Sequence, residues 1–353
     1  VLGVSPARRA AFEVLARVER GAKSDIALLE ALRGLDSRDA GLATQIVYGV
    51  LRRRAQLDWL IGQASARPLE KLDPAVLRAL RIGAFQLRFL ERVPRHAAVD
   101  SSVELVKHAG LRSAAGFVNA VLRRLPERPA RWPDEALEYS MPAWLLEKWK
   151  RTLGEEDARR AARAALEEPE PGERGGRRMD EGAQSIVPLL DLRPGELFLD
   201  VCAAPGNKTL QAMEAGVRAV ACDASLTRLR AFLAPCPRVQ ADAARGLPFG
   251  RVFDRILVDA PCTGTGTLGR NPEIRWRVTA QEILRQSQRQ EAILREAMQC
   301  LKPGGRLVYS TCSLEPEENE EVVRRTAGGR VKHMAQRVPG RDAGDGFFAA
   351  VIE

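Results

Sequence analysis

The chain has 353 residues and a formal net charge of +9, with 45% hydrophobic and 29% charged residues. This length favours two domains, and the composition is typical of a globular protein with a sizeable core. No apolar run approaches the roughly 20 residues that span a bilayer. The first 20 residues become charged too early for a secretory signal. We therefore expect a cytoplasmic protein with no membrane partner.

The positive charge is concentrated in the first part of the chain. Residues 1–150 contain 25 Lys and Arg against 17 Asp and Glu, whereas the remainder contains 30 against 29. A basic domain beside a nearly neutral one suggests an appended module that binds a polyanion, with Arg52-Arg53-Arg54 and Arg123-Arg124 as candidate phosphate contacts. Each of these clusters is more often a solvated helix face.

The six cysteines and three histidines do not have the spacing of a metal site. The sequence contains no CxxC pair, and the histidines lie far apart. We therefore expect no bound metal, and thiols that stay reduced in a cytoplasmic protein. Cys222 and Cys300 are predicted to be small buried side chains, which is the usual fate of a free cysteine.

The first ~125 residues are predicted to be helical throughout, because apolar residues recur at the helical period. Asp73 and Pro74 combine a helix N-cap with a proline at the first helical position. A later apolar stripe, Phe117–Leu125, ends at Pro126. This pattern predicts an all-α first domain.

The pattern changes after residue 127. Trp144–Leu166 is predicted to be helical, and Glu167–Arg178 is a charged linker containing Gly and Pro. Beyond the linker, short apolar strands alternate with helical stretches such as Gln281–Leu301; the predicted strands are Leu197–Val201, Val217–Cys222, Val252–Val258 and Arg306–Tyr309. This alternation predicts an α/β domain with a mostly parallel sheet covered by helices.

The first predicted strand of the sheet runs into a loop of small residues and then into a helix. The loop is Cys202-Ala203-Ala204-Pro205-Gly206-Asn207-Lys208. Small residues let a ligand approach the backbone, and ligands of open α/β sheets bind at the carboxyl ends of the strands. Alone, the loop also fits an ordinary strand-to-helix turn.

Acidic residues follow the later strands in order. Asp223 lies about 20 residues after the loop, where an acid can bind ribose hydroxyls. Asp242 follows a short apolar stretch, and Asp259 ends the next strand. Each acid alone is more often a cap or turn residue, but their order along successive strand ends favours a nucleotide-like cofactor.

Two short motifs complete the pattern: Asp259-Ala260-Pro261-Cys262 and Ser310-Thr311-Cys312-Ser313. Together with the loop and with Pro316-Glu317-Glu318-Asn319-Glu320, they resemble the RNA 5-methylcytosine methyltransferases. The resemblance is closest to the bacterial RsmB (Sun/Fmu) group, which methylates 16S ribosomal RNA, and it covers nearly the whole chain. Residues 95–100 and 117–124 resemble the NusB-like RNA-binding domain of that group.

The resemblance implies a NusB-like helical domain over residues 1–127, a linker and helical connection over 128–180, and a Rossmann-like class I methyltransferase domain over 181–353. The last strand is expected to be antiparallel and to open at residues 344–348. S-Adenosylmethionine is implied as the cofactor, contacted by the loop from Cys202 to Lys208, Asp223, Asp242 and Asp259. Asn207 departs from the family, which usually has a second glycine there. The connection over residues 167–178 is also shorter than the family's, which carries an Arg-x-Asn motif.

The two motif cysteines have separate roles by resemblance. Carbon 5 of cytosine is a poor nucleophile, and addition of a thiolate to carbon 6 converts the ring to an enamine that can attack a methyl donor. Cys312 is implied to be the nucleophile, and Cys262 is implied to assist product release. Asp259 is expected to bind the cytosine edge as well. DNA cytosine methyltransferases attack from the Pro-Cys position, so the additional Thr-Cys favours RNA.

The expected partner is RNA with an unstacked target base, most simply 16S ribosomal RNA. Two alternatives stay open: the same chemistry on transfer RNA, and a non-catalytic RNA-binding scaffold with a vestigial cofactor fold. The sequence predicts neither the methylated nucleotide nor the oligomeric state.

Overall fold

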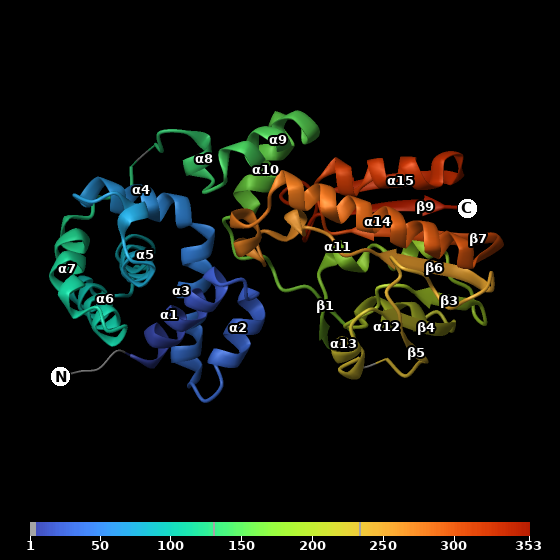
Figure 1. The fold of residues 1–353 in the computed structure, drawn as a ribbon, viewed down its shortest axis with the longest axis horizontal. Coiled ribbons are helices and arrows are strands. Elements are labelled where there is room, and N and C mark those ends of the chain that lie inside the picture. Colours follow the sequence, from blue (N-terminus) through green and yellow to red (C-terminus); the bar gives the residue numbers. More distant parts are fainter. Residues whose placement is uncertain (1–4, 130, 233) are drawn as a thin grey trace. The chain divides into compact units, whose positions relative to one another are not determined.

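The computed structural model describes residues 5–129, 131–232 and 234–353, which form two compact units (Figure 1). The first unit comprises Val1–Leu146, Ala165–Glu167 and Asn271–Trp276, and the second comprises Glu147–Ala164, Glu168–Arg270 and Arg277–Glu353. None of the described helices is long and apolar enough to cross a membrane.

The first unit is helical, as the sequence predicts. Its main helices are α1 (Pro6–Glu19), α2 (Ser24–Ala31), α3 (Ser37–Arg52), α4 (Arg54–Ala64), α5 (Pro74–Phe89), α6 (Arg95–His108) and α7 (Ala115–Arg124). The predicted start of α5 is confirmed: the Asp73 side chain accepts a hydrogen bond from the Ala75 N–H at 2.8 Å, and Pro74 follows the cap. Short helical turns occur at Leu69–Lys71, Arg112–Ala114 and α8 (Glu135–Glu138).

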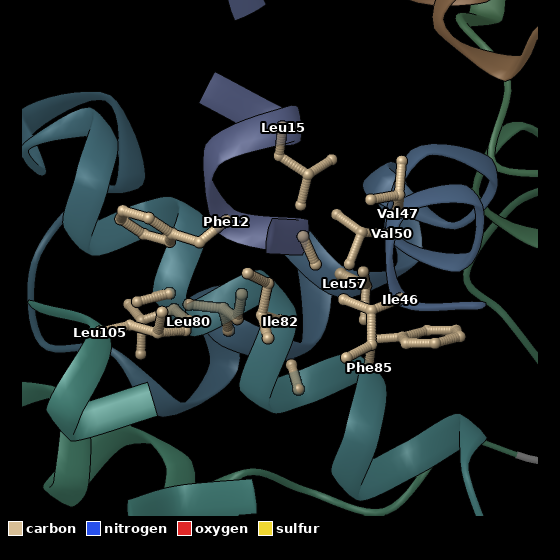
Figure 2. Packing of buried hydrophobic residues seen from close by; sticks show 14 of the residues in the cluster. Phe12, Leu15, Ile46, Val47, Val50, Leu57, Leu80, Ile82, Phe85 and Leu105 are labelled. Atoms are coloured by element: carbon tan, nitrogen blue, oxygen red, sulfur yellow. The ribbon is translucent and has the colours of Figure 1, made fainter. Parts of the chain in front are cut away.

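The core of this unit lies where α1, α3, α4, α5 and α6 meet (Figure 2). Buried side chains from every one of these helices pack together, including Phe12, Ile46, Leu57, Leu80, Phe85 and Leu105. Gly49 of α3 allows the close approach of α5, because a Cβ at this position would lie 1.9 Å from Cζ of Phe85. The periodic apolar stripes of the sequence are therefore the buried faces of these helices.

A segment from much later in the chain completes the first unit. The short helix η5 (Pro272–Trp276) brings the buried Glu273 against Ser24, whose N–H and hydroxyl both donate to its carboxylate at 3.0 and 2.7 Å. The buried guanidinium of Arg275 donates to backbone carbonyls, among them those of Ala165 at 2.6 Å and Ser140 at 3.2 Å. Burial, with Arg52 and Arg53 nearby, lowers the pKa of Arg275 to about 9.

The second unit is built on a seven-stranded sheet in the order β5-β4-β3-β6-β7-β9-β8. The strands are β3 (Leu197–Asp200), β4 (Arg218–Asp223), β5 (Arg238–Gln240), β6 (Phe253–Asp259), β7 (Leu301–Thr311), β8 (Val331–Arg337) and β9 (Phe347–Ile352). The first five strands of the order pair in parallel, and β9 pairs antiparallel with β7 and β8. The mostly parallel Rossmann-like sheet is confirmed, as is the antiparallel last strand.

Helices cover both faces of the sheet, and the strands alternate between two apolar clusters. On one face Ile256 and Leu307 pack with α14 (Ala280–Cys300) and α15 (Glu320–Ala327). On the other face Leu257 and Val308 pack with α12 (Asn207–Met213) and η3 (Val187–Leu190). Strands buried on both faces explain the continuous apolar runs in the sequence.

The connection before the sheet differs in detail from the prediction. The helix expected over Trp144–Leu166 is two helices, α9 (Ala143–Leu153) and α10 (Glu155–Ala164), because Gly154 between them adopts a φ of +87° that ends the first helix. The charged linker contains a hairpin of β1 (Glu173–Arg174) and β2 (Arg177–Arg178), turning at Gly175 and Gly176. The four-residue helix α11 (Glu181–Gln184) follows it.

Candidate active site

The carboxyl ends of β3, β6 and β7 meet at the centre of the sheet, where the strand order reverses and ligands bind in open α/β sheets. A cavity of about 200 Å³ opens there. Its lining includes most of the predicted loop together with strand-end acids: Arg178, Met179, Asp180, Ala183, Asp200, Cys202, Ala203, Ala204, Pro205, Asn207, Lys208 and Asp259.

Asp200, at the end of β3, is a buried acid in this cavity. One carboxylate oxygen, Oδ2, accepts from the hydroxyl of Thr209 at 2.7 Å, whereas Oδ1 has no hydrogen-bond partner among the described residues. Burial raises the pKa of Asp200 to about 7, and Thr209 acts in the opposite direction. An unpaired buried acceptor is costly, so the site fits a ligand that brings a hydrogen-bond donor or a cation.

The loop after β3 is shaped by Gly206, which has a φ of +110° at the start of α12. A Cβ on Gly206 would lie 2.6 Å from the ring of Phe232, so both backbone conformation and space favour glycine. Asn207, the residue that departs from the expected second glycine, is accommodated at the first position of the helix and lines the cavity.

Asp223, at the end of β4, is buried and holds the same loop. Its carboxylate accepts from the backbone N–H of Ala204 at 3.2 Å and of Ser225 at 2.8 Å, and Arg228 lies 3.3 Å away. Asp242 lies beyond β5 and is half-buried, and it caps a turn through the N–H of Ala244 at 3.2 Å. Neither Asp223 nor Asp242 lines the cavity itself.

Lys208 and Asp259 form an ion pair beside the cavity. Nζ of Lys208 lies 2.7 Å from Oδ2 of Asp259, and the hydroxyl of Ser310 donates to Oδ1 at 2.7 Å. Burial disfavours the ammonium, but the charge and hydrogen bond of Asp259, followed by Cys312, raise the pKa of Lys208 above its usual value. Asp259 is thereby fixed with both oxygens engaged, at the ends of β6 and β7.

The two motif cysteines lie in contact. Sγ of Cys262, just after β6, is 3.3 Å from Sγ of Cys312, just after β7, and both side chains are partly exposed. Their hydrogen bond is the largest cause that raises the pKa of the Cys262 thiol, followed by burial, by the charge of Cys312 and by Glu318. The Cys262 thiol is therefore favoured in its protonated form, in contact with Cys312. All six cysteines carry free thiols.

Glu318, in η6 (Pro316–Glu318), joins the two cysteine loops. Its buried carboxylate accepts from the backbone N–H of Thr263 at 2.8 Å and also from the Thr263 hydroxyl. From the other loop, the Ser313 hydroxyl donates to it at 2.5 Å, and Gln290 of α14 donates at 3.1 Å. Burial raises the pKa of Glu318, and these hydrogen bonds oppose the shift.

Asn319 fixes the backbone on both sides of Cys312. Its Oδ1 accepts from the Thr311 hydroxyl at 2.5 Å, and its Nδ2 donates to the Ser313 carbonyl at 2.9 Å. The acidic motif that follows the Thr-Cys pair, through Glu318 and Asn319, thus holds the two cysteine-bearing loops in place. Residue spacing alone does not reveal this role, since the partners of Glu318 lie 5, 28 and 55 residues away.

Comparisons with known proteins agree with this geometry. The NusB family matches residues 5–127, and the family described as 16S rRNA methyltransferase RsmB/F matches residues 187–339. The ribosomal RNA small subunit methyltransferase B of Thermus thermophilus is 37% identical over 90% of this chain and 86% of its own length. That of Erwinia tasmaniensis is 32% identical and covers 95% of each chain. The chain belongs to the 16S rRNA methyltransferase RsmB/F family.

Solved structures support the fold of this RsmB/F family member. The crystal structure of PH0851 matches 100% of this chain and 99% of that chain with a TM-score of 0.81 at 24% identity. A methyltransferase homolog protein from Pyrococcus horikoshii matches 63% of this chain and 99% of that one with a TM-score of 0.52, also at 24% identity. At this identity the two likenesses show the fold alone.

S-Adenosylmethionine is the cofactor of this family. The residues of the cavity fit it: the unpaired Oδ1 of Asp200 suits the ammonium of its methionine end, and the loop from Cys202 to Asn207 presents small side chains. Asp223 lies beside the same loop at the next strand end, where ribose hydroxyls are bound in such folds. Asp200 was not singled out by the sequence, although an acid that ends an apolar strand is a recognisable signal.

Proposed function

We propose that this RsmB/F family member methylates carbon 5 of a cytosine in RNA through a covalent adduct with Cys312. The observation that carries the proposal is the contact between the Cys262 and Cys312 thiols at 3.3 Å, next to the Lys208–Asp259 pair of the cofactor cavity. A pair of free thiols at the ends of adjacent strands has no use in cofactor binding alone. It suits a reaction in which one sulfur must bind and later leave a pyrimidine ring.

The charges around the two thiols support the division of roles. The ammonium of Lys208 interacts with Cys312, whereas the carboxylate of Glu318 disfavours a thiolate at Cys262. Positive charge nearby stabilises a thiolate and negative charge destabilises it. Glu318 therefore disfavours a thiolate at Cys262, and we assign the nucleophile to Cys312, beside the ammonium of Lys208.

The reaction then follows from these positions. The Cys312 thiolate adds to carbon 6, and the electron pair of the 5,6 double bond moves to carbon 5. S-Adenosylmethionine supplies an electrophilic methyl group for that carbon. Asp259, held by Lys208 and Ser310, accepts a hydrogen bond from the cytosine edge and orients the ring. The proton on carbon 5 then passes to water, and its bonding electron pair restores the double bond. The Cys312 sulfur leaves as a thiolate, which the S–H of Cys262 stabilises.

Single-cysteine variants test this mechanism. Cys312→Ala should abolish methylation and form no adduct, while cofactor binding stays close to normal. Cys262→Ala should still form the adduct but release it slowly, so that a protein–RNA species accumulates on denaturing gels when cofactor is present. The double variant should lose that species. An adduct trapped by Cys312→Ala instead of Cys262→Ala would reverse the roles, and normal methylation by both variants would refute the mechanism.

We further propose that the substrate is 16S ribosomal RNA. The names of the relatives from Thermus thermophilus and Erwinia tasmaniensis, the NusB match and the positive charge of residues 1–150 support this substrate. Bisulfite sequencing of RNA from cells with and without the gene tests it. Loss of one methylated cytosine in 16S RNA is expected. Loss in transfer RNA alone would change the substrate, and no loss in any RNA would favour a scaffold.

A further inference from the structure

The helical unit contains a polar cavity of its own, with a volume of about 310 Å³. Its walls come from the α3–α4 junction, the end of α5 and the segment after α7, and they comprise Arg53, Gln56, Phe89, Glu127, Arg128, Pro129 and Trp132. The sequence offered the triplet Arg52-Arg53-Arg54 as one candidate, but only Arg53 of the three lines this cavity. Arg52 is buried over Tyr48, and Arg54 lies over Trp276 and near Asp58.

Two guanidinium groups share one aromatic ring in this cavity. The guanidinium carbon of Arg53 lies 4.7 Å from the centroid of Phe89, and that of Arg128 lies 5.1 Å from it. Contact with the ring holds each planar group in place while its N–H donors remain available at the edges. Two arginines that are 75 positions apart in the sequence thus direct their guanidinium groups into the same cavity.

The positive charge of the pair is not neutralised by a direct partner. Within the described part of the chain, neither Arg53 nor Arg128 has a carboxylate at ion-pair distance. Glu127, the acid in the cavity wall, lies 3.4 Å from Arg88 and 3.8 Å from Arg95 instead. Burial lowers the pKa of Arg53, and repulsion by Arg128 and Arg52 lowers it further, whereas the charge of Glu167 acts in the opposite direction.

The remaining walls are preformed. Gln56 is buried, accepts from Arg53 at 3.1 Å and donates to the Glu138 carbonyl at 2.8 Å, so its amide cannot turn toward a ligand without breaking a contact. Trp132 packs edge-on against Trp59, with ring centroids 5.7 Å apart. A preformed cavity lined by two guanidinium groups and by aromatic side chains suits an anion attached to an apolar or sugar-like group.

We propose that this cavity binds one phosphate of the RNA backbone, with Arg53 and Arg128 each donating to its free oxygens and Phe89 fixing both guanidiniums. The proposal rests on the proposed function, in that RNA is the substrate. It adds a defined anchor in the helical unit, formed by two arginines that are distant in sequence. The phosphate would offset the repulsion between the two guanidiniums, which is a free-energy gain that an isolated surface arginine does not offer.

Equilibrium binding of a fluorescently labelled single-stranded RNA oligonucleotide to the full chain, without cofactor, tests this anchor. The variants are Arg53→Gln, Arg128→Gln and the double variant. Arg33→Gln is the control, because Arg33 is exposed in the same unit and its replacement removes the same single positive charge. Each cavity variant should weaken binding about threefold to tenfold at moderate salt. The double variant should be weaker by less than the product of the two, since both groups contact one phosphate. The slope of log K against log salt should fall by about 0.7.

Three outcomes overturn the proposal, and they have different meanings. If wild type binds RNA and both cavity variants match Arg33→Gln, the anchor is absent but the proposed function stands. If wild type itself does not bind RNA, the proposed substrate class fails together with the anchor. Polyglutamate is a second probe, which represents an acidic protein segment. If its binding depends on Arg53 and Arg128 while RNA binding does not, the cavity binds an acidic protein segment. Arg128→Gln guards against misfolding, because Arg128 is exposed and its loss leaves the packed helices intact.

Discussion

The backbone N–H of Thr263 donates to the buried carboxylate of Glu318 at 2.8 Å, and this bond ties the Pro-Cys loop to the segment that follows the Thr-Cys loop. Because Ser313 binds the same carboxylate, Glu318 sets the separation of the two thiols and places negative charge on the Cys262 side.

Glu318→Gln should therefore change which thiol reacts. Removing the charge lowers the pKa of Cys262, so alkylation of Cys262 by iodoacetamide at neutral pH should become at least about threefold faster, as measured by peptide mass spectrometry. Methylation should fall at the same time. Glu320→Gln, two residues away, should alter neither. Unchanged alkylation of Cys262 in Glu318→Gln would show that Glu318 acts through packing alone.

Asp200→Asn should change how stability depends on pH. The folded-state pKa of Asp200 is about 7, above its unfolded value near 3.8, so the folded chain holds this proton more tightly. The free energy of unfolding should accordingly fall as pH rises from about 4 to above 7, because ionising the buried acid costs free energy in the folded state alone. Asp200→Asn should lose this fall in urea titrations. The same pH profile in variant and wild type would contradict the burial argument.

Replacing Asp223 and replacing Asp242 should have different effects on the affinity for the cofactor. Asp223→Ala should weaken S-adenosylmethionine binding by about 1–3 kcal/mol in calorimetry, because ribose hydroxyls and the Ala204 N–H lose an acceptor. Asp242→Ala should cost less, since Asp242 caps a turn beyond β5 and, among the described residues, makes no hydrogen bond to the loop from Cys202 to Lys208. The reverse order would move the ribose contact to Asp242. No effect of either change would remove both from the site.

Glu273→Ala should destabilise the helical unit despite its distance in sequence. The variant leaves the buried N–H and hydroxyl of Ser24 without an acceptor, which costs about 1–3 kcal/mol in the free energy of unfolding. Urea unfolding followed by circular dichroism measures the loss. Glu70→Ala, at an exposed position, is the control and should change little. Equal stability of the two variants would show that the Ser24–Glu273 contact contributes nothing.

Features that depend on local pattern were predictable from the sequence. The strands before Cys202 and Cys262 stand out because they are buried on both faces, and the helix start at Asp73-Pro74 depends on adjacent residues. The edge strand β8 was not expected, because its residues are mostly polar and only β9 pairs with it. The contact of Cys262 with Cys312 follows from parallel neighbouring strands, once β6 and β7 are known to pair.

Roles that depend on burial and distant partners were not predictable. Asp200 is distinguished by a carboxylate oxygen without a hydrogen-bond partner in the described part of the chain, and Glu318 by four hydrogen-bond donors from three segments of the chain. Neither property can be inferred from the order of residues in the sequence. Likewise, the sequence treats Arg52, Arg53 and Arg54 alike, whereas Arg52 ends α3, Arg54 begins α4, and only Arg53, at the junction between them, reaches Phe89.

The membership of Asn271–Trp276 in the helical unit has a consequence for biosynthesis. Glu273 and Arg275 supply buried contacts to Ser24 and Ala165, which precede them by 249 and 110 residues. At about 5–20 residues per second, Ser24 waits roughly 12–50 s for Glu273 to be translated. During this interval Ser24 and the carbonyls later bound by Arg275 remain open to water or to a chaperone. The N-terminal unit therefore matures only after most of the sheet's parallel strands have been translated.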